Sequence, residues 1–172
     1  MAYIHQEKDL DYLRYIITRS VAAQYFRQLR ISRTQGYPML ISSLPGYLAL
    51  QQLVAKQNGE TVQKHLQKEE KLYLKGRAAE SNQEPSLLQV DEESTYVSDK
   101  KGPIVFYQLA KKIGKQRLNM IISDFYRLGK EKKVTDVSDF YELLKTHIPV
   151  SRREELGKLL TNTDIGQYHF VK

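Results

Sequence analysis

The chain has 172 residues, 41% of them hydrophobic, and no cysteine, so it can form one globular domain but no disulfide or cysteine metal site. Its formal net charge of +7 makes nucleic acid, anionic lipid or acidic protein a partner to consider. No stretch approaches the roughly 18 apolar residues of a membrane-spanning helix, and the first residues are too charged for a signal peptide.

Helical periodicity runs through the first half of the chain. Residues 9–26 predict a first helix, with Asp9 as its cap and one apolar stripe facing the core. The stripe consists of Leu10, Leu13, Ile16, Ile17, Val21 and Phe26. A second helix is expected over residues 40–57 and a third, very polar one over residues 60–77. On that polar helix we expect His65 to be exposed.

The middle of the chain predicts a polar interruption followed by two helices. Residues 79–101 contain few apolar side chains and are expected to form a long loop, with a short extended piece at residues 87–90. Residues 102–113 form a compact apolar stretch that begins with a proline suited to a first helical turn. Gly114 should separate it from a helix over residues 116–128.

Two further helices are expected near the C-terminus. A periodic stretch over residues 136–146 has three suitable caps at its start, Thr135, Asp136 and Ser138. Ser151, with Glu154 three residues later, predicts a capping box for the last helix. The tail after residue 163 is expected to be extended.

The sequence as a whole predicts an all-α fold, a bundle of seven or so helices in a single domain over residues 1–172. No two of its four histidines are four residues apart, so none forms a metal-binding pair on one helical turn. There is no phosphate-binding loop and no nucleophile elbow. The basic residues are dispersed and lack an RNA-binding or zinc-finger signature, so nucleic acid is not the expected partner.

Two stretches resemble a known family when their order and spacing are taken together. The first, residues 16–60, contains Gln24-Tyr25-Phe26, a Gln35-Gly36 turn, Met39-Leu40-Ile41-Ser42-Ser43-Leu44 and Tyr47. The second, residues 96–109, contains Asp99-Lys100-Lys101-Gly102. Together they resemble the helical catalytic region of gluzincin zinc aminopeptidases of the aminopeptidase N type. The version fused to bacterial ABC-transporter permeases is the most similar. The resemblance implies the helical half of a thermolysin-like aminopeptidase catalytic domain.

The residues that carry the chemistry of that family are all replaced. The family binds zinc through two histidines four apart and a glutamate, with a second glutamate as general base and a tyrosine that stabilises the oxyanion. The corresponding positions are Arg19 and Ala23, Ser42, Ser20 and Asp99, with eighteen residues between Ala23 and Ser42. None of these side chains can do the same work. The resemblance therefore implies a domain without zinc, without any other cofactor and without catalysis.

A positive side chain stands where the family holds its metal. We hypothesise that Arg19 replaces the charge of the zinc ion and pairs with Asp99, with Ser20 or Ser42 completing the hydrogen bonds, because a buried guanidinium needs a partner. The alternative is that Arg19 extends into solvent and Asp99 lies in a mobile loop.

Two interpretations of the aromatic residues remain open. Tyr25, Phe26, Tyr47 and Tyr107 can line an old substrate groove or pack in the core at helical spacing.

The resemblance favours a structural or protein- and peptide-binding role within an ABC-transporter-associated membrane protein. In the family, a β-rich lobe precedes the zinc helix. Only about fifteen residues precede it here, so we expect a fragment of a longer protein, outside the cytoplasm, whose partner is the remainder of its own chain. One alternative is a metallopeptidase with a relocated or partner-completed site. Another is a basic domain that binds nucleic acid or anionic lipid.

Overall fold

The computed structural model describes residues 7–56 and 59–163. Within these residues the chain forms seven α-helices and two π-helical turns, and no strand beyond an isolated bridge. The elements are α1 (Glu7–Arg27), η1 (Met39–Ser43), α2 (Leu44–Lys56), α3 (Gly59–Ala79), η2 (Val97–Lys101), α4 (Gly102–Ile113), α5 (Lys115–Glu131), α6 (Val137–His147) and α7 (Val150–Thr161). The predicted all-α class is therefore confirmed.

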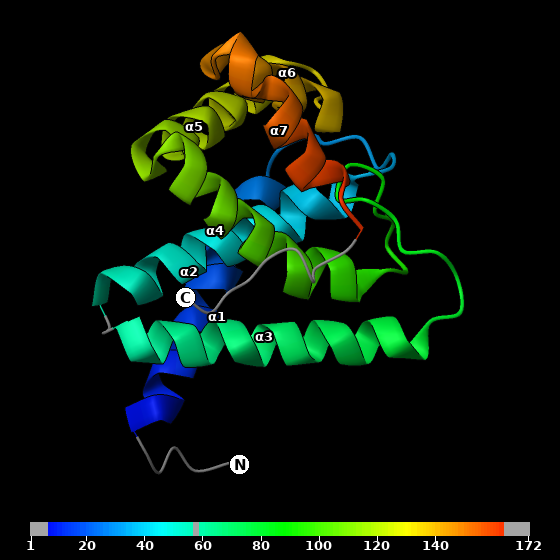
Figure 1. Cartoon of the computed structure of the whole chain (residues 1–172). Coiled ribbons are helices and arrows are strands. Elements are labelled where there is room, and N and C mark those ends of the chain that lie inside the picture. Colours follow the sequence, from blue (N-terminus) through cyan, green and yellow to red (C-terminus); the bar gives the residue numbers. More distant parts are fainter. Residues whose placement is uncertain (1–6, 57–58, 164–172) are drawn as a thin grey trace.

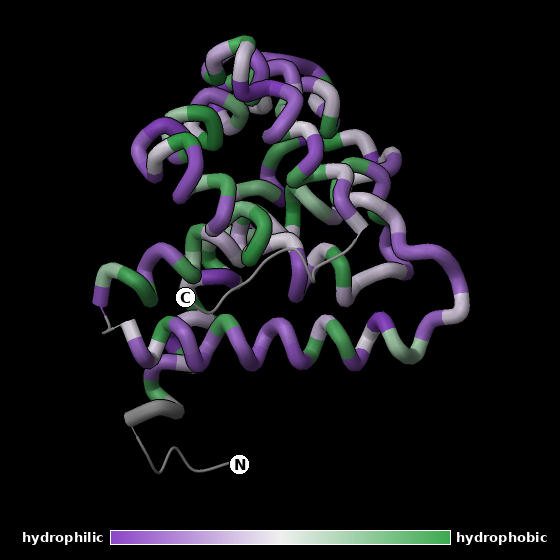
Figure 2. The backbone as a smooth tube through the Cα atoms, viewed as in Figure 1, coloured by the Kyte–Doolittle hydropathy of each residue, from purple (hydrophilic) through white to green (hydrophobic). Residues whose placement is uncertain are grey.

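Helix α4 lies at the centre of the molecule. It contacts α2, α5, α7 and both π-helical turns, and α3 runs along the lower edge of Figure 1 while α5, α6 and α7 gather at the top. Eight of its twelve residues are buried, which explains why the sequence shows it as a nearly continuous apolar stretch. In contrast, α3 is largely hydrophilic with apolar positions at intervals (Figure 2), as expected of a helix that covers one side of a bundle.

The main core is organised around a run of aromatic rings from four helices. Phe106 of α4 lies 5.9 Å from Phe140 of α6, and Phe140 lies 5.5 Å from Phe125 of α5, both edge to face. Tyr47 of α2 extends the run, 6.3 Å from Phe106. All four side chains are fully buried. Such rings bury large areas and favour this geometry, so they fix how the helices cross.

Most of the apolar stripe predicted for α1 faces away from the core, although Phe26 is buried and Ile16 is partly buried. Leu10, Leu13, Ile17 and Val21 are 40%, 38%, 53% and 48% exposed, whereas Tyr15 is buried. Helix α1 carries apolar side chains on two faces, and the sequence pattern does not say which face meets the core. The ring of Tyr15 provides more buried area than the smaller aliphatic residues, and it joins a second core cluster between α1, α2, α3 and α4.

The predicted loop is shorter than expected. Residues 97–101, placed in the loop from their polar composition, form η2 and continue directly into α4. Residues 87–89 form a turn, and the predicted extended piece at residues 87–90 is absent. Leu87 is nevertheless buried, and its N–H donates to the carbonyl of Leu160 at 3.1 Å. Tertiary contacts, rather than local propensity, therefore determine the helical state of residues 97–101 and the conformation around Leu87.

Caps are predicted for three helices, and one of these predictions is confirmed while two are wrong. Helix α1 already includes Glu7, so Asp9 lies within the helix rather than at its cap. The carboxylate of Asp136 accepts from the N–H groups of Ser138 and Asp139 at 2.8 and 3.1 Å, and Asp139 completes a capping box. Helix α7 instead begins at Val150 after Pro149, so Ser151 lies inside its first turn and makes no cap bond. The expected extended tail lies outside the described residues.

Candidate functional site

The positions assigned by the family resemblance lie on three elements that contact one another. Helix α1 carries three of them, η1 carries one and η2 carries one, and η1 contacts both α1 and η2. The positions are Arg19, Ser20 and Ala23 on α1, Ser42 on η1 and Asp99 on η2. Both turns outside α1 are π-helical, a rare conformation that is frequent at functional sites.

An ion pair occupies the centre of this arrangement. Nη2 of Arg19 lies 2.6 Å from Oδ1 of Asp99, and the two side chains are 18% and 36% exposed. The predicted pairing is confirmed, and the alternative with Arg19 in solvent is wrong. The prediction that Ser20 or Ser42 completes the hydrogen bonds of this pair is not confirmed. Ser20 is exposed, and within the described residues neither Ser20 nor Ser42 hydrogen-bonds to the pair.

Helix α3 supplies a second layer of polar side chains behind the pair. Its buried Glu69 forms an ion pair with Lys100, the neighbour of Asp99, at 3.1 Å. The ring of His65, one turn earlier on α3, packs against the ring of Tyr15 at a tilt of 58°, with 4.2 Å between centroids. Burial and the nearby Glu69 raise the pKa of Tyr15 above its ordinary value, so its hydroxyl stays protonated. Arg19 on α1, Asp99 and Lys100 on η2, and Glu69 on α3 thus form a row of alternating positive and negative charges.

Sequence reasoning missed this second layer, although a signal for it was present. His65 and Glu69 are four residues apart and therefore share one face of α3. Most residues of α3 are polar or charged, and this composition hides the buried face. Tyr15 was left out of the predicted stripe of α1.

The prediction that His65 is exposed is wrong, because its side chain is mostly buried. Its Nε2 is buried without a hydrogen-bond partner. Burial, with Lys68 and Lys100 nearby, lowers the pKa of His65 to about 4 from 6.5. The folded state therefore favours the neutral ring.

This depressed pKa predicts a specific loss of stability in acid. Between pH 6.5 and about 4 the unfolded chain binds the proton and the folded chain does not, so the free energy of unfolding falls as the pH falls. His65 alone is expected to contribute up to about 3 kcal/mol of this decrease. Urea unfolding at several pH values, compared between the wild type and H65Q, measures it. Parallel pH profiles for the two proteins would contradict the prediction.

The two π-helical turns pack closely where Ser43 of η1 meets Gly102, the residue that follows η2. The hydroxyl of Ser43 donates to the carbonyl of Ser98 at 2.7 Å. A Cβ on Gly102 would lie 2.0 Å from Oγ and 2.5 Å from Cβ of Ser43. Only a glycine fits at this point of the chain, which explains the glycine that follows the two lysines.

Alanine at position 102 is therefore expected to destabilise the protein by about 1–3 kcal/mol through overpacking. In an ordinary helix the same change stabilises, since alanine is the better helix former. The double variant S43G/G102A should recover stability, whereas S43A/G102A should not because the clashing Cβ remains. Thermal unfolding followed by circular dichroism distinguishes these variants. A G102A protein as stable as the wild type would refute this packing.

The residues at the site do not fit a zinc ion. A catalytic zinc needs three protein ligands, and here the corresponding side chains are a guanidinium, a methyl group and a hydroxyl. Asp99, the one carboxylate among the five positions, is already bound to Arg19. Among the described residues, no group of three or more histidine, cysteine, aspartate or glutamate side chains could hold a metal ion.

The four aromatic residues considered for a groove lie in different environments. Phe26 and Tyr47 are 3% and 0% exposed and belong to the core, so they are not available to an open groove. Tyr25 is 55% exposed and meets Tyr126 edge to face at 6.3 Å. Tyr107 is partly buried, beneath the ammonium of Lys111.

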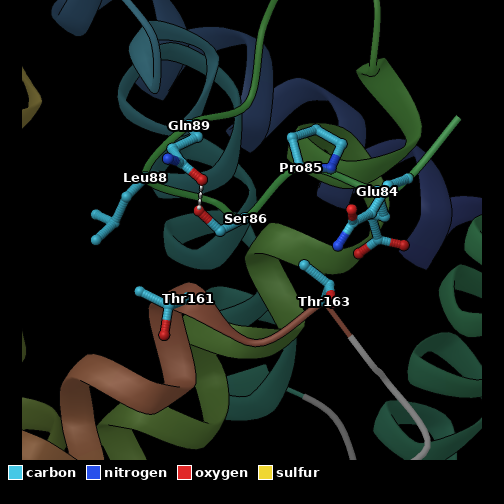
Figure 3. Close-up of a pocket in the computed structure, with 8 residues that line it drawn as sticks. Glu84, Pro85, Ser86, Leu88, Gln89, Thr161 and Thr163 are labelled. Carbon is cyan, nitrogen blue, oxygen red and sulfur yellow. Dashed lines mark hydrogen bonds between the residues drawn. The ribbon is translucent and has the colours of Figure 1, made fainter.

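Two surface cavities lie away from the five positions. One, of about 470 Å³, lies between residues 83–89 and the end of α7 (Figure 3). Its one ionisable lining residue, Glu84, is already bound by Lys101 and by the hydroxyl of Tyr73. The other, of about 610 Å³, is lined by Leu88 together with residues of the α1–η1 loop and α6. Neither combines a nucleophile with a free base.

No family model, curated protein or solved structure matches the chain. The aminopeptidase resemblance thus remains an expectation drawn from the sequence. In residues 7–56 and 59–163, no helix combines the length and the apolar character needed to cross a bilayer.

Proposed function

We propose that this chain is a non-catalytic, peptidase-like helical domain with a protein-binding role inside a larger, transporter-associated membrane protein. The Arg19–Asp99 ion pair supports the loss of catalysis. A guanidinium at this place repels a divalent cation and occupies the carboxylate that could attract one. The link to a transporter, and a position outside the cytoplasm, rest on the sequence resemblance.

The observation that carries the binding role is the exposed apolar face of α1. This face is defined by Leu10, Leu13, Ile17, Val21 and Tyr25, which follow one another at helical spacing and are each more than a third exposed. Contiguous apolar patches on a folded surface mark interaction sites far more often than scattered residues do. In the family resemblance a further lobe precedes this helix, so a segment of the same longer protein is the proposed occupant.

Elemental analysis tests the first half of the proposal. The purified chain, dialysed without chelator, is expected to contain no zinc above background and to hydrolyse no aminoacyl chromogenic substrate when zinc is added. Stoichiometric zinc that supports hydrolysis would overturn the non-catalytic assignment and favour a relocated metallopeptidase site.

A dye-binding experiment tests the second half. The native protein is expected to enhance the fluorescence of an apolar probe such as ANS, and I17S/V21S should reduce that signal without changing the unfolding transition. The matched control is L72S/L74S on α3, where both leucines are also exposed. An equal loss of ANS fluorescence in both variants would show that the α1 face binds the probe no better than exposed leucines elsewhere, and would contradict the proposed binding role.

A further inference from the structure

The tertiary structure joins two basic segments that are 97 to 108 residues apart in the sequence. Residues 27–33 carry three arginines and no acidic residue, and residues 130–135 carry three lysines and one glutamate, a net +5 of the chain's +7. A parallel bridge between Ile31 and Thr135 fastens them together. Thr135 N–H donates to Arg30 O at 2.9 Å, and Ser32 N–H donates to Thr135 O at 2.8 Å.

The six cations of these segments form what we call the basic face. They are Arg27, Arg30, Arg33, Lys130, Lys132 and Lys133, and all six are exposed. Lys132 pairs with Asp139 at 2.6 Å, and Glu131 is the one acidic residue within the segments. The carboxylate of Asp136, close by in sequence, is engaged in capping α6. Counting Glu131, Asp136 and Asp139 against the six cations leaves a local net charge of +3, so the basic face stays positive.

Apolar and aromatic side chains are exposed beside these cations. Val134, between Lys133 and the bridge, is 52% exposed, and Tyr25 is 55% exposed. Tyr25 meets Tyr126, whose ring lies 5.4 Å from the ammonium of Lys130. Tyrosine and aliphatic side chains among lysines and arginines are the combination favoured at the headgroup level of a bilayer.

Two tyrosines beside the cations, Tyr37 and Tyr126, argue against a single-stranded nucleic acid. Base stacking requires open ring faces. The guanidinium of Arg33 lies over the ring of Tyr37 at 5.8 Å, and Lys130 lies over Tyr126. These rings are therefore already covered by cations of the basic face.

We propose that the basic face binds the surface of a membrane that contains anionic lipid. The lysines and arginines attract the headgroups, while Val134 and Tyr25 enter the interface. This inference is distinct from the proposed protein-binding role, because it depends on the joined basic segments and not on the Arg19–Asp99 pair. Tyr25 is the one residue that the two proposals share, and the charge variants below leave it unchanged.

Vesicle sedimentation tests the proposal directly. The chain is expected to bind phosphatidylcholine vesicles that contain phosphatidylglycerol, to ignore phosphatidylcholine alone, and to dissociate as salt is raised. The variant R27Q/R30Q/K133Q removes three exposed charges and should weaken partitioning on the order of 100-fold. The matched control K68Q/K71Q/K75Q removes the same charge from α3, at the opposite edge of the molecule (Figure 1). It should stay within about threefold of the wild type.

Three outcomes would overturn the proposal. The first is the absence of binding to anionic vesicles even at low salt. The second is an equal loss in both triple variants, which would show attraction by net charge alone. The third is tighter binding to a DNA duplex than to anionic vesicles at the same salt, which would make nucleic acid the partner. Zinc content and dye binding should be the same in all these variants, so the outcome is separate from that of the proposed function.

Discussion

Replacing Lys101 with methionine is expected to lower the free energy of unfolding by about 3–5 kcal/mol, because it leaves the buried carboxylate of Glu84 with only the more distant, partly exposed Arg77 at 3.8 Å. The ammonium of Lys101 is fully buried, 2.6 Å from Oε1 of Glu84 and 2.7 Å from the carbonyl of Asn162. Glu84 is itself 2% exposed and also accepts from Tyr73. Urea unfolding monitored by circular dichroism measures the loss.

The double variant E84M/K101M provides the internal control. Replacing both members of a buried pair by apolar side chains removes the unpaired charge, so much of the lost stability should return. K71M, at an exposed position on α3, should change stability by less than about 0.5 kcal/mol. A K101M protein as stable as K71M would mean that Glu84 is neutral or hydrated in the folded state.

Lys101 also determines the geometry of the candidate site. It lies at the end of η2, two residues after Asp99, and its ammonium connects that turn to the preceding loop and to the end of α7. The buried ion pair therefore fixes the backbone from which Asp99 reaches Arg19. In this chain Lys101 therefore supports the site and is not itself one of the five positions.

Truncating Phe140 to alanine is expected to cost about 3–5 kcal/mol, since it opens a cavity at the meeting point of three helices. Its fully buried ring contacts Phe106 and Phe125 in two edge-to-face pairs, and each pair adds to the effect of burial. Chemical unfolding gives the value.

F140L is the matched comparison, because leucine fills most of the space but removes the ring pairs. It should lose clearly less stability than F140A. Equal losses would show that the ring geometry, rather than the cavity, dominates. A loss below about 1 kcal/mol in F140A would mean that the three helices close around the space.

The sequence by itself determined most of the helices. The 3.6-residue period, the early proline of α4 and the cap at Asp136 are local signals. Such signals depend on neighbouring residues in the sequence and not on tertiary contacts. The charge of Arg19 also follows from the sequence alone. The pairing with Asp99 could be predicted because the family resemblance placed two distant positions together.

Only the tertiary structure decided which surfaces meet. The face of α1 that is buried, the helical state of residues 97–101, the burial of His65 and the assembly of the basic face all depend on contacts between segments far apart in the chain. Periodicity describes the two faces of a helix but not their partners. Burial, charge pairing and pKa depend on those partners, because the energy of a side chain is set by the neighbours that replace water around it.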